Sequence, residues 1–255
     1  MVRGESSLFA EPQIRPNFAD CYFYHTIDLP DIGTVNGEWD LRGRFDEYIG
    51  FTPLQGKRVL DVGTASGFLT WEAEKRGAEV VSFDLDHARR QKLLPFRNSI
   101  YCIDRQESER QREEFFGSMK RSYWLCHSLF QSKARVHYGD IENLPRELGH
   151  FDVAFLCSVL EHLPDHIQAM WSAATLSDRL VIVTPTLATE ERIAQFAGYR
   201  DHPEANFSFW RYALGVYREV LGMMGFEITS VTDKSFRHLG SGQDVARTTI
   251  VADRC

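Results

Sequence analysis

Two apolar runs flank a glycine-containing turn and a helical pattern near residue 60, and this order limits the chain to few folds. The first run covers residues 58–62, the turn covers 63–67, and the second run covers 79–84, after a helical stretch that ends at Gly77. Such an order predicts a βαβ unit, which commonly binds a nucleoside. Glycine suits the turn because it has no side chain and adopts positive φ, so the backbone can approach a ligand.

Asp61 indicates which nucleoside the turn accepts. A dinucleotide site usually carries Gly-x-Gly-x-x-Gly, whose glycines admit a pyrophosphate, but here Ala65 replaces the middle glycine and Asp61 stands two residues before Gly63. A carboxylate aimed into the turn would repel a pyrophosphate, whereas it suits a cationic ammonium such as the amino-acid end of S-adenosylmethionine. Asp84, at the tip of the second run, stands where a carboxylate can accept both ribose hydroxyls.

At this turn the chain resembles the class I methyltransferases. Their first motif is Asp-x-Gly-x-x-x-Gly, which Asp61, Gly63 and Gly67 match. Ala65 departs from the motif at a position where that family accepts the substitution. The resemblance implies that S-adenosylmethionine is the methyl donor and S-adenosylhomocysteine the product.

Two later segments extend the resemblance. The run at 134–141 ends in Asp140 and Ile141, and in that family this acid lies against the adenine amino group while the apolar residue packs on the ring. Residues 151–165 read FDVAFLCSVLEHLPD and are similar to the family's pattern at the fourth strand and its exit loop. The carboxyl ends of parallel strands are where an open α/β sheet binds its ligand. Taken singly, Asp61 also suits a turn, and Asp84 and Asp140 also suit helix caps.

A narrower resemblance concerns residues 24–86 and 123–163. Both segments look like the branch related to the tRNA wobble-uridine carboxymethyltransferase, which also contains small-molecule methyltransferases. In that branch, aromatic and basic residues before the first strand contact the cofactor, and Trp39 with Arg42 or Arg44 stand in matching places. Nothing in the sequence identifies carboxymethyl transfer. The predicted cofactor residues are Trp39, Arg42, Asp61, Gly63, Thr64, Ala65, Gly67, Asp84, Leu85, Asp140, Ile141 and Cys157.

The expected fold is a Rossmann-like α/β domain with a seven-stranded, mostly parallel sheet, helices on both faces and a final antiparallel pair. Residues 1–56 are predicted to form an N-terminal cap segment and 57–255 the methyltransferase domain. The link between the second and third strands, about 87–134, is too long for a simple loop, so it predicts a helical insertion with a helix over 105–131. Residues 185–210 are predicted to form a substrate lid.

Methyl transfer to a hydroxyl or a cationic amine needs a base that removes a proton. His162, at the exit of the fourth strand, is the first candidate, because an imidazole titrates near neutral pH. The alternative is that His162 shapes its loop or contacts the cofactor. His25 and Tyr24 are the next candidates, since they lie in the segment expected to fold over the cofactor.

Four further residues are candidates for the acceptor pocket. His202 and Trp210 precede the last helix, in the predicted lid. His127 and Trp124 lie on the helix predicted over 105–131, where a structural role in the core is an equal alternative.

Two other site types are disfavoured. His162 and His166 are four residues apart, as on a zinc-binding helix, but Pro164 interrupts that face, so no metal site is expected. Cys157 at the fourth strand's tip lacks the Pro-Cys context of pyrimidine C5 methyltransferases, and the Asn-Pro-Pro-Tyr motif of amino-group DNA methyltransferases is absent.

Charge and cysteine usage narrow the partners. The 255 residues carry a net charge of −7, which disfavours broad nucleic-acid binding, although residues 87–135 hold eleven Lys and Arg against five Asp and Glu. The bland interpretation of that segment is a solvated helix with mixed charges. Five scattered cysteines without a Cys-x-x-Cys pair and no long apolar run predict a cytoplasmic protein with no membrane partner. The oligomeric state is left open.

The predicted function is S-adenosylmethionine-dependent methylation of a hydroxyl or amine of a small molecule, for which natural products and sugar-containing metabolites are considered. One alternative keeps the fold and makes tRNA or a nucleotide the acceptor, through residues 87–135. A second alternative is a nicotinamide-type oxidoreductase or a non-catalytic nucleoside-binding protein.

Overall fold

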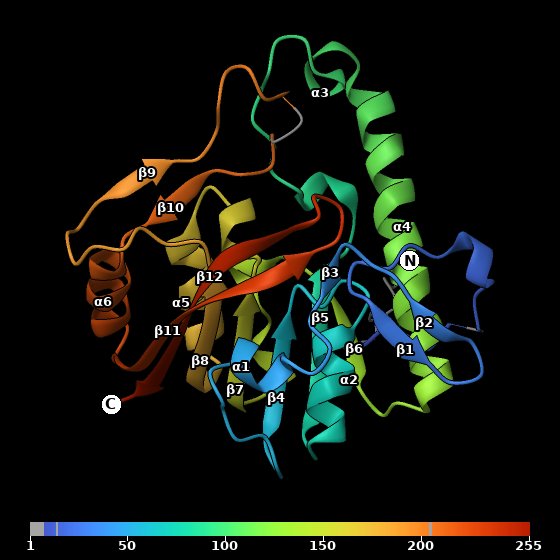
Figure 1. The fold of residues 1–255 in the computed structure, drawn as a ribbon, viewed down its shortest axis with the longest axis horizontal. Coiled ribbons are helices and arrows are strands. Elements are labelled where there is room, and N and C mark those ends of the chain that lie inside the picture. The colour runs from blue at the N-terminus through green and yellow to red at the C-terminus, as the bar shows by residue number, and fades with distance from the viewer. Residues whose placement is uncertain (1–7, 14, 204–205) are drawn as a thin grey trace, which may run out of the picture.

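The structure is a computed structural model, which describes residues 8–13, 15–203 and 206–255. Its main sheet contains the strands β3 (Trp39–Asp40), β4 (Arg58–Val62), β5 (Glu79–Leu85), β6 (Arg135–Gly139), β7 (Phe151–Cys157), β8 (Ser177–Thr184), β11 (Phe226–His238) and β12 (Gln243–Arg254). They are arranged in the order β3-β11-β12-β8-β7-β4-β5-β6 (Figure 1).

Five adjacent strands of this sheet, from β8 to β6, run parallel, and β12 and β11 close it as an antiparallel pair. The carboxyl ends of β4, β5, β6 and β7 therefore lie at one edge of the sheet, where a Rossmann-like α/β fold binds its ligand. The predicted α/β class is confirmed.

The predicted number of strands is wrong, because the main sheet has eight rather than seven. The addition is β3, whose Trp39 and Asp40 pair with the far end of β11. Strand β11 reaches that far because the β11–β12 hairpin is long, with strands of 13 and 12 residues, and its distal half extends past the buried part of the sheet. Charged residues recur along the distal half of this hairpin, so it lacks the apolar pattern that marks a buried strand.

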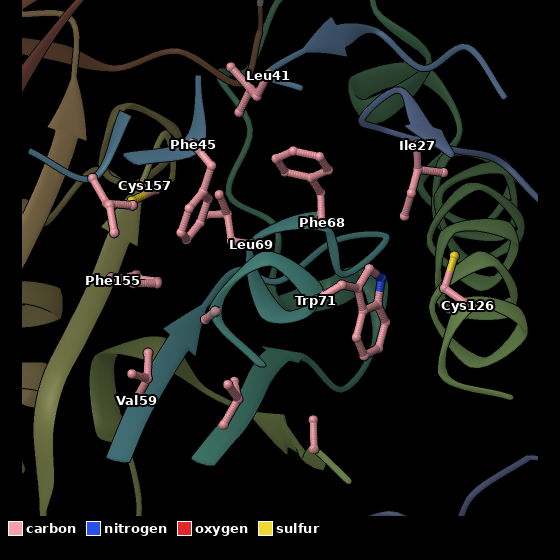
Figure 2. Close-up of a cluster of buried hydrophobic side chains, with 14 of the residues drawn as sticks. Ile27, Leu41, Phe45, Val59, Phe68, Leu69, Trp71, Cys126, Phe155 and Cys157 are labelled. Atoms are coloured by element: carbon pink, nitrogen blue, oxygen red, sulfur yellow. The ribbon is translucent and has the colours of Figure 1, made fainter. Parts of the chain in front are cut away.

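The helices are α1 (Phe45–Tyr48), α2 (Phe68–Lys75), α3 (Ile100–Ile103), α4 (Arg105–Phe130), α5 (His166–Ala174) and α6 (Leu214–Met223). They cover both faces of the sheet, because neighbouring residues of its buried strands point to opposite sides. Val59 and Phe155 pack with α2 and α4 in one core, part of which Figure 2 shows. Leu60 and Leu156 pack with α5 and α6 in the other.

The link from β5 to β6 contains α4, close to the helix predicted over 105–131. Asp104 caps α4, because its carboxylate accepts from the backbone N–H groups of Gln106 and Glu107. The loop before α4 meets the predicted lid, where the N–H of Leu94 donates to the carbonyl of Asn206 at 2.6 Å. Two segments far apart in the sequence thus touch near the carboxyl edge of the sheet.

Two small hairpins complete the fold. Strands β1 (Ile27–Leu29) and β2 (Gly33–Val35) form one, and β9 (Ala194–Phe196) and β10 (Trp210–Tyr212) form the other (Figure 1). Residues 1–7 and 14 of the predicted cap and 204–205 of the predicted lid lie outside the described residues, and both boundaries stay predictions.

In the described residues, short 3₁₀ helices lie at Phe18–Asp20, Ala88–Arg90, Ile141–Asn143, Arg146–Leu148 and Leu160–His162. Within the described part of the chain, no helix combines the length and the apolar character needed to cross a membrane.

Candidate active site

The turn after β4 adopts left-handed backbone at three positions, with φ of 80° at Gly63, 51° at Ala65 and 89° at Gly67. A Cβ on Gly67 would lie 2.5 Å from Cε2 of Trp71, so space as well as φ requires glycine there. Ala65 tolerates its positive φ because its N–H donates to Oδ2 of Asp84 at 2.8 Å. The end of β5 therefore stabilises the turn at the position where the motif usually has a glycine.

Asp61 lies buried beneath this turn. Its Oδ2 accepts hydrogen bonds from the hydroxyls of Thr64 at 2.8 Å and Thr70 at 2.7 Å. Its Oδ1 is buried and has no hydrogen-bond partner among the described residues. Burial raises the pKa of Asp61 from 3.8 to about 6. A buried oxygen without a donor fits a cationic group bound at the turn.

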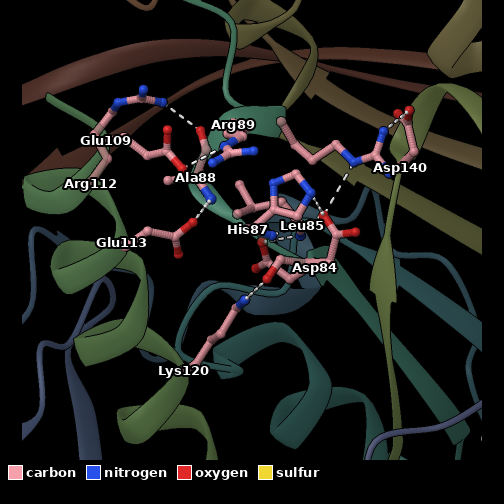
Figure 3. Close-up of polar contacts among 12 residues, drawn as sticks. Asp84, Leu85, His87, Ala88, Arg89, Glu109, Arg112, Glu113, Lys120 and Asp140 are labelled. Atoms are coloured by element: carbon pink, nitrogen blue, oxygen red, sulfur yellow. Dashed lines mark hydrogen bonds and ion pairs between the residues drawn. The ribbon is translucent and has the colours of Figure 1, made fainter. Parts of the chain in front are cut away.

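Asp84 ends β5 with both carboxylate oxygens engaged by backbone, since Oδ1 accepts from the N–H of Leu85 at 2.7 Å and Oδ2 from Ala65. Burial raises the pKa of its carboxyl, while the charge of Lys120 acts in the opposite direction. Lys120 extends from α4 toward this strand end, and its Nζ donates to the carbonyl of Asp86 at 2.8 Å (Figure 3). Each oxygen of Asp84 retains a lone pair for a ligand hydroxyl.

Asp140 follows β6 and caps the short helix that begins at Ile141, because its Oδ1 accepts from the N–H of Glu142. Its Oδ2 pairs with Nη1 of Arg90 at 2.7 Å. Arg90 belongs to the same insertion as Ala88 and Arg89, which Figure 3 shows beside α4. Asp140, which follows β6, is thus linked to the insertion by an ion pair.

A cavity of about 810 Å³ opens over these strand ends. It brings together most of the predicted site residues: Tyr24, His25, Trp39, Gly63, Thr64, Ala65, Asp84, Leu85, Asp140, Ile141, Cys157, His162, His202 and Trp210. Cavities of this size accommodate a cofactor or a drug-sized ligand. Its wall runs from the tips of β4, β5 and β6 to the β9–β10 hairpin.

Arg42 is not brought to this cavity. Its guanidinium is paired with Asp28 at 2.7 Å and with Asp40 at 2.8 Å, on the outer side of the N-terminal segment. Arg44, the alternative, pairs with Glu47 instead. Of Trp39, Arg42 and Arg44, which the narrower resemblance placed at the cofactor, Trp39 alone lines the cavity.

His127 and Trp124 also lie away from the cavity. Trp124 is 2% exposed, and the His127 ring packs 5.1 Å from it and 6.1 Å from Trp71. Nε2 of His127 is 3.1 Å from the carbonyl of Ala134. These contacts favour the alternative of a core histidine on α4.

His162 and His166 diverge. Nδ1 of His162 is 3.1 Å from the carbonyl of Phe207, whereas His166 is fully buried against Tyr212. Burial lowers the pKa of His166 to about 4. Among the residues that the structure describes, no group of three or more His, Cys, Asp or Glu side chains is arranged to hold a metal ion.

A polar group at the exit of β7 was not predicted from the sequence. Ser158 has a φ of 51°, its hydroxyl lies 3.0 Å from that of Tyr48, and it accepts from Nε of Arg247 at 3.3 Å. Nη2 of Arg247 lies 3.9 Å from Oε1 of Glu161. Arg247 offered little sequence signal, because it is a single charge entering an apolar strand.

The fold and the turn define a class I methyltransferase domain. A family model described as a methyltransferase domain matches residues 40–231, so the chain belongs to this family, whose methyl donor is S-adenosylmethionine. This assignment sets aside the nicotinamide-type oxidoreductase.

One curated relative is the ubiquinone biosynthesis O-methyltransferase of Ralstonia nicotianae, 31% identical over 136 residues. The match covers 52% of this chain and 44% of that protein, so the chain matches less than half of the relative's length.

Many solved structures share the fold, including the following two. Magnesium protoporphyrin IX methyltransferase from Synechocystis PCC 6803, with bound SAH, has a TM-score of 0.54 at 17% identity and matches 83% of this chain and 82% of its own. The N-terminal domain of EvdMO1, with SAH and D-fucose, has a TM-score of 0.52 at 14% identity and matches 90% of both chains.

Proposed function

We propose that this chain transfers a methyl group from S-adenosylmethionine to a hydroxyl or amine of a small molecule. The observation that carries the proposal is the single cavity that joins the strand ends of the first motif to aromatic residues of the β9–β10 region. S-adenosylmethionine supplies an electrophilic methyl group, and the protein must align the acceptor, exclude water and take up a proton.

The order of the strands supports one direction for the cofactor. Asp140 and Ile141 at β6 suit the adenine, Asp84 at β5 suits the ribose, and Asp61 beneath the β4 turn suits the ammonium. Strand β7 is the next neighbour of β4, so the methyl group would face the β7 exit, where His162 lies.

Asp84→Ala should weaken S-adenosylhomocysteine binding by about 1–3 kcal/mol, because ribose hydroxyls would lose a buried acceptor. Glu79→Ala is the matched control, since Glu79 lies at the opposite end of the same strand β5 and does not line the cavity. Calorimetric titration measures both. Equal affinities for the two variants would contradict the ribose assignment.

His162 is the base that the site supports best. Burial lowers the pKa of His25 to about 3 and raises that of Tyr24 to about 12, so neither group is matched to proton uptake near neutral pH. His162 is half-buried, lines the cavity and has Nε2 free of the contact that Nδ1 makes with Phe207. His25 and Tyr24 then shape the wall beside the cofactor.

His162→Ala should lower turnover by roughly a hundredfold or more, while cofactor affinity stays within about threefold. His202→Ala, which removes another histidine of the cavity wall, is the comparison. A parallel loss of turnover and of cofactor affinity in His162→Ala would instead assign this residue to cofactor binding.

A tRNA acceptor, and with it the wobble-uridine branch, is less well supported. Four of the eleven cations of residues 87–135 are neutralised locally, in the pairs Arg89–Glu109, Arg90–Asp86, Arg110–Glu107 and Arg121–Glu114. Phosphate contacts would give tRNA binding a steep salt dependence. Tight, salt-sensitive tRNA binding would favour this alternative.

The first test is titration of the protein with S-adenosylmethionine, S-adenosylhomocysteine and NAD in parallel. We expect micromolar binding of both sulfur nucleosides and none of NAD, because Asp61 opposes a pyrophosphate. Binding of NAD alone would refute the proposed function.

A further inference from the structure

We propose that Arg247 binds a carboxylate of the acceptor, and that the acceptor is therefore a small acid with a flat, apolar body. This inference rests on the proposed function, because it assigns the part of the cavity that the cofactor leaves for the acceptor. The observations that carry it are the place of Arg247 in the cavity, its incomplete set of hydrogen bonds and the aromatic residues around it.

Arg247 lies at the acceptor end of the cavity. It stands on β12, two strands beyond β7, on the side of the sheet away from β5 and β6. The contacts proposed for the adenine, the ribose and the ammonium come from the ends of β6, β5 and β4, so the wall formed by Ser158, Glu161 and Arg247 is left for the second substrate. A charged group here would meet the acceptor and not the adenosine.

The guanidinium of Arg247 is held in place from three sides. Nε donates to Ser158 at 3.3 Å, Nη1 donates to the carbonyl of Ala246 at 3.0 Å, and the carbon Cζ lies 4.8 Å from the ring centroid of Trp39. The side chain is 12% exposed, which is low for an arginine. A charged group so positioned before any ligand binds loses little side-chain entropy when a ligand arrives.

Nη2 of Arg247 is nevertheless not hydrogen-bonded to any described residue. Its nearest acid is Glu161, at 3.9 Å, which is beyond hydrogen-bond distance. Among the described residues, the carboxylate of Glu161 in turn accepts only a long bond, from the hydroxyl of Thr184 at 3.4 Å. Glu161 therefore balances the buried charge without saturating the guanidinium, and a ligand carboxylate could approach to the 2.7–2.9 Å typical of charge-assisted bonds.

Aromatic side chains form the rest of this end. Phe207 and Trp210 come from the lid region, and Trp39 comes from β3. Faces of this kind pack on rings and other flat apolar groups. An apolar body between them, with a carboxylate on Arg247 and its reacting group toward His162, would occupy this space.

The test uses two probes of nearly equal shape, 4-hydroxybenzoate and 4-hydroxybenzamide, which differ in charge. Each is titrated into the protein saturated with S-adenosylhomocysteine. We expect the wild-type protein to bind the carboxylate at least about tenfold more tightly than the amide, the size of one charge-assisted hydrogen bond. Arg247→Gln should reduce this ratio to within about threefold and leave S-adenosylhomocysteine affinity unchanged.

Three variants separate this role from a structural one. Arg247→Lys keeps the charge and should keep part of the preference, which also covers the case that Arg247→Gln folds poorly. Glu161→Gln removes the competing carboxylate and should strengthen benzoate binding. Arg237→Gln, on the same hairpin but paired with Asp244 outside the cavity, is the matched control and should behave as wild type.

The proposal would be overturned if the wild-type protein showed no preference for the carboxylate, or if the preference survived in Arg247→Gln. It would also be overturned if the preference disappeared instead in Arg211→Gln, since Arg211 also lines the cavity. Failure of the proposed function looks different, because the wild-type protein would then not bind S-adenosylhomocysteine at all.

Discussion

Gly37→Ala should destabilise the protein by about 3 kcal/mol, at the upper end of the cost of overpacking a rigid site. A Cβ on residue 37 would overlap the backbone carbonyl carbon of His25 and lie 2.7 Å from its Cα and its N. Backbone cannot swing aside as a side chain can, so the two segments must separate. The neighbouring bond from the N–H of Glu38 to the carbonyl of Tyr24, at 2.8 Å, would be disturbed as well.

Urea denaturation measures this loss as a lower midpoint. Gly222→Ala is the control, because a Cβ there meets nothing within 4 Å among the described residues and alanine favours the helix α6 by up to about 1 kcal/mol. Since Tyr24 and His25 line the cavity, S-adenosylhomocysteine affinity should fall in Gly37→Ala and stay constant in Gly222→Ala. Unchanged stability of Gly37→Ala would show that the segment moves freely.

The placement of the residues proposed to bind the cofactor could be predicted, because their sequence signals are local. Asp61, Gly63 and Ala65 belong to one strand and one turn, and Asp84 and Asp140 each end a strand with a clear apolar run. Once the strands are parallel, their carboxyl ends must meet at one edge. A pattern of strands and strand ends was therefore enough to bring Gly63, Ala65, Asp84 and Asp140 to one cavity, with Asp61 buried beneath the turn.

The acceptor half could not be predicted in the same way. Arg247 approaches Ser158 across 89 residues, through a hairpin extension without a strong strand pattern. Tyr48 and Glu161 likewise meet this group only through tertiary packing. Contacts of this kind depend on how far β12 extends and on which face of the sheet its side chains lie. A single sequence does not contain that information.

For the aromatic residues on α4, the sequence left two roles open, in the acceptor pocket or in the core. His127 and Trp124 have residue types common in binding sites, but their helix packs that face onto α2 and Trp71. Periodicity locates the apolar face of a helix, and it does not distinguish a face that lines a cavity from one that fills a core.

Acid should weaken cofactor binding through Asp61. The pKa of this buried carboxyl is raised to about 6 in the ligand-free protein, above its usual 3.8, so between these values the folded state holds a proton that the unfolded state releases. The group therefore makes the ligand-free protein more stable as the pH falls through 6, and less stable above it. A bound ammonium has the reverse preference, because it favours the carboxylate and must displace that proton.

S-adenosylhomocysteine affinity should accordingly fall about tenfold between pH 7 and pH 5, following the ionised fraction of a group with a pKa of about 6. S-adenosylmethionine should show the same slope, since both ligands carry the ammonium. The Asp61→Asn variant should bind S-adenosylhomocysteine more weakly at pH 7, by about 1.5–3 kcal/mol, and its affinity should depend less on pH.

The decisive comparison is 5′-methylthioadenosine, which retains the adenosine and lacks the amino-acid end. Any titration of Asp84, whose pKa burial also raises, affects this ligand and S-adenosylhomocysteine alike, so the difference between their two profiles isolates Asp61. We expect the profile of 5′-methylthioadenosine to be nearly flat between pH 5 and pH 7 and to be unaffected by Asp61→Asn. Equal slopes for both ligands would place the ammonium elsewhere, because a carboxylate that does not touch this group has no reason to lose its proton when it binds.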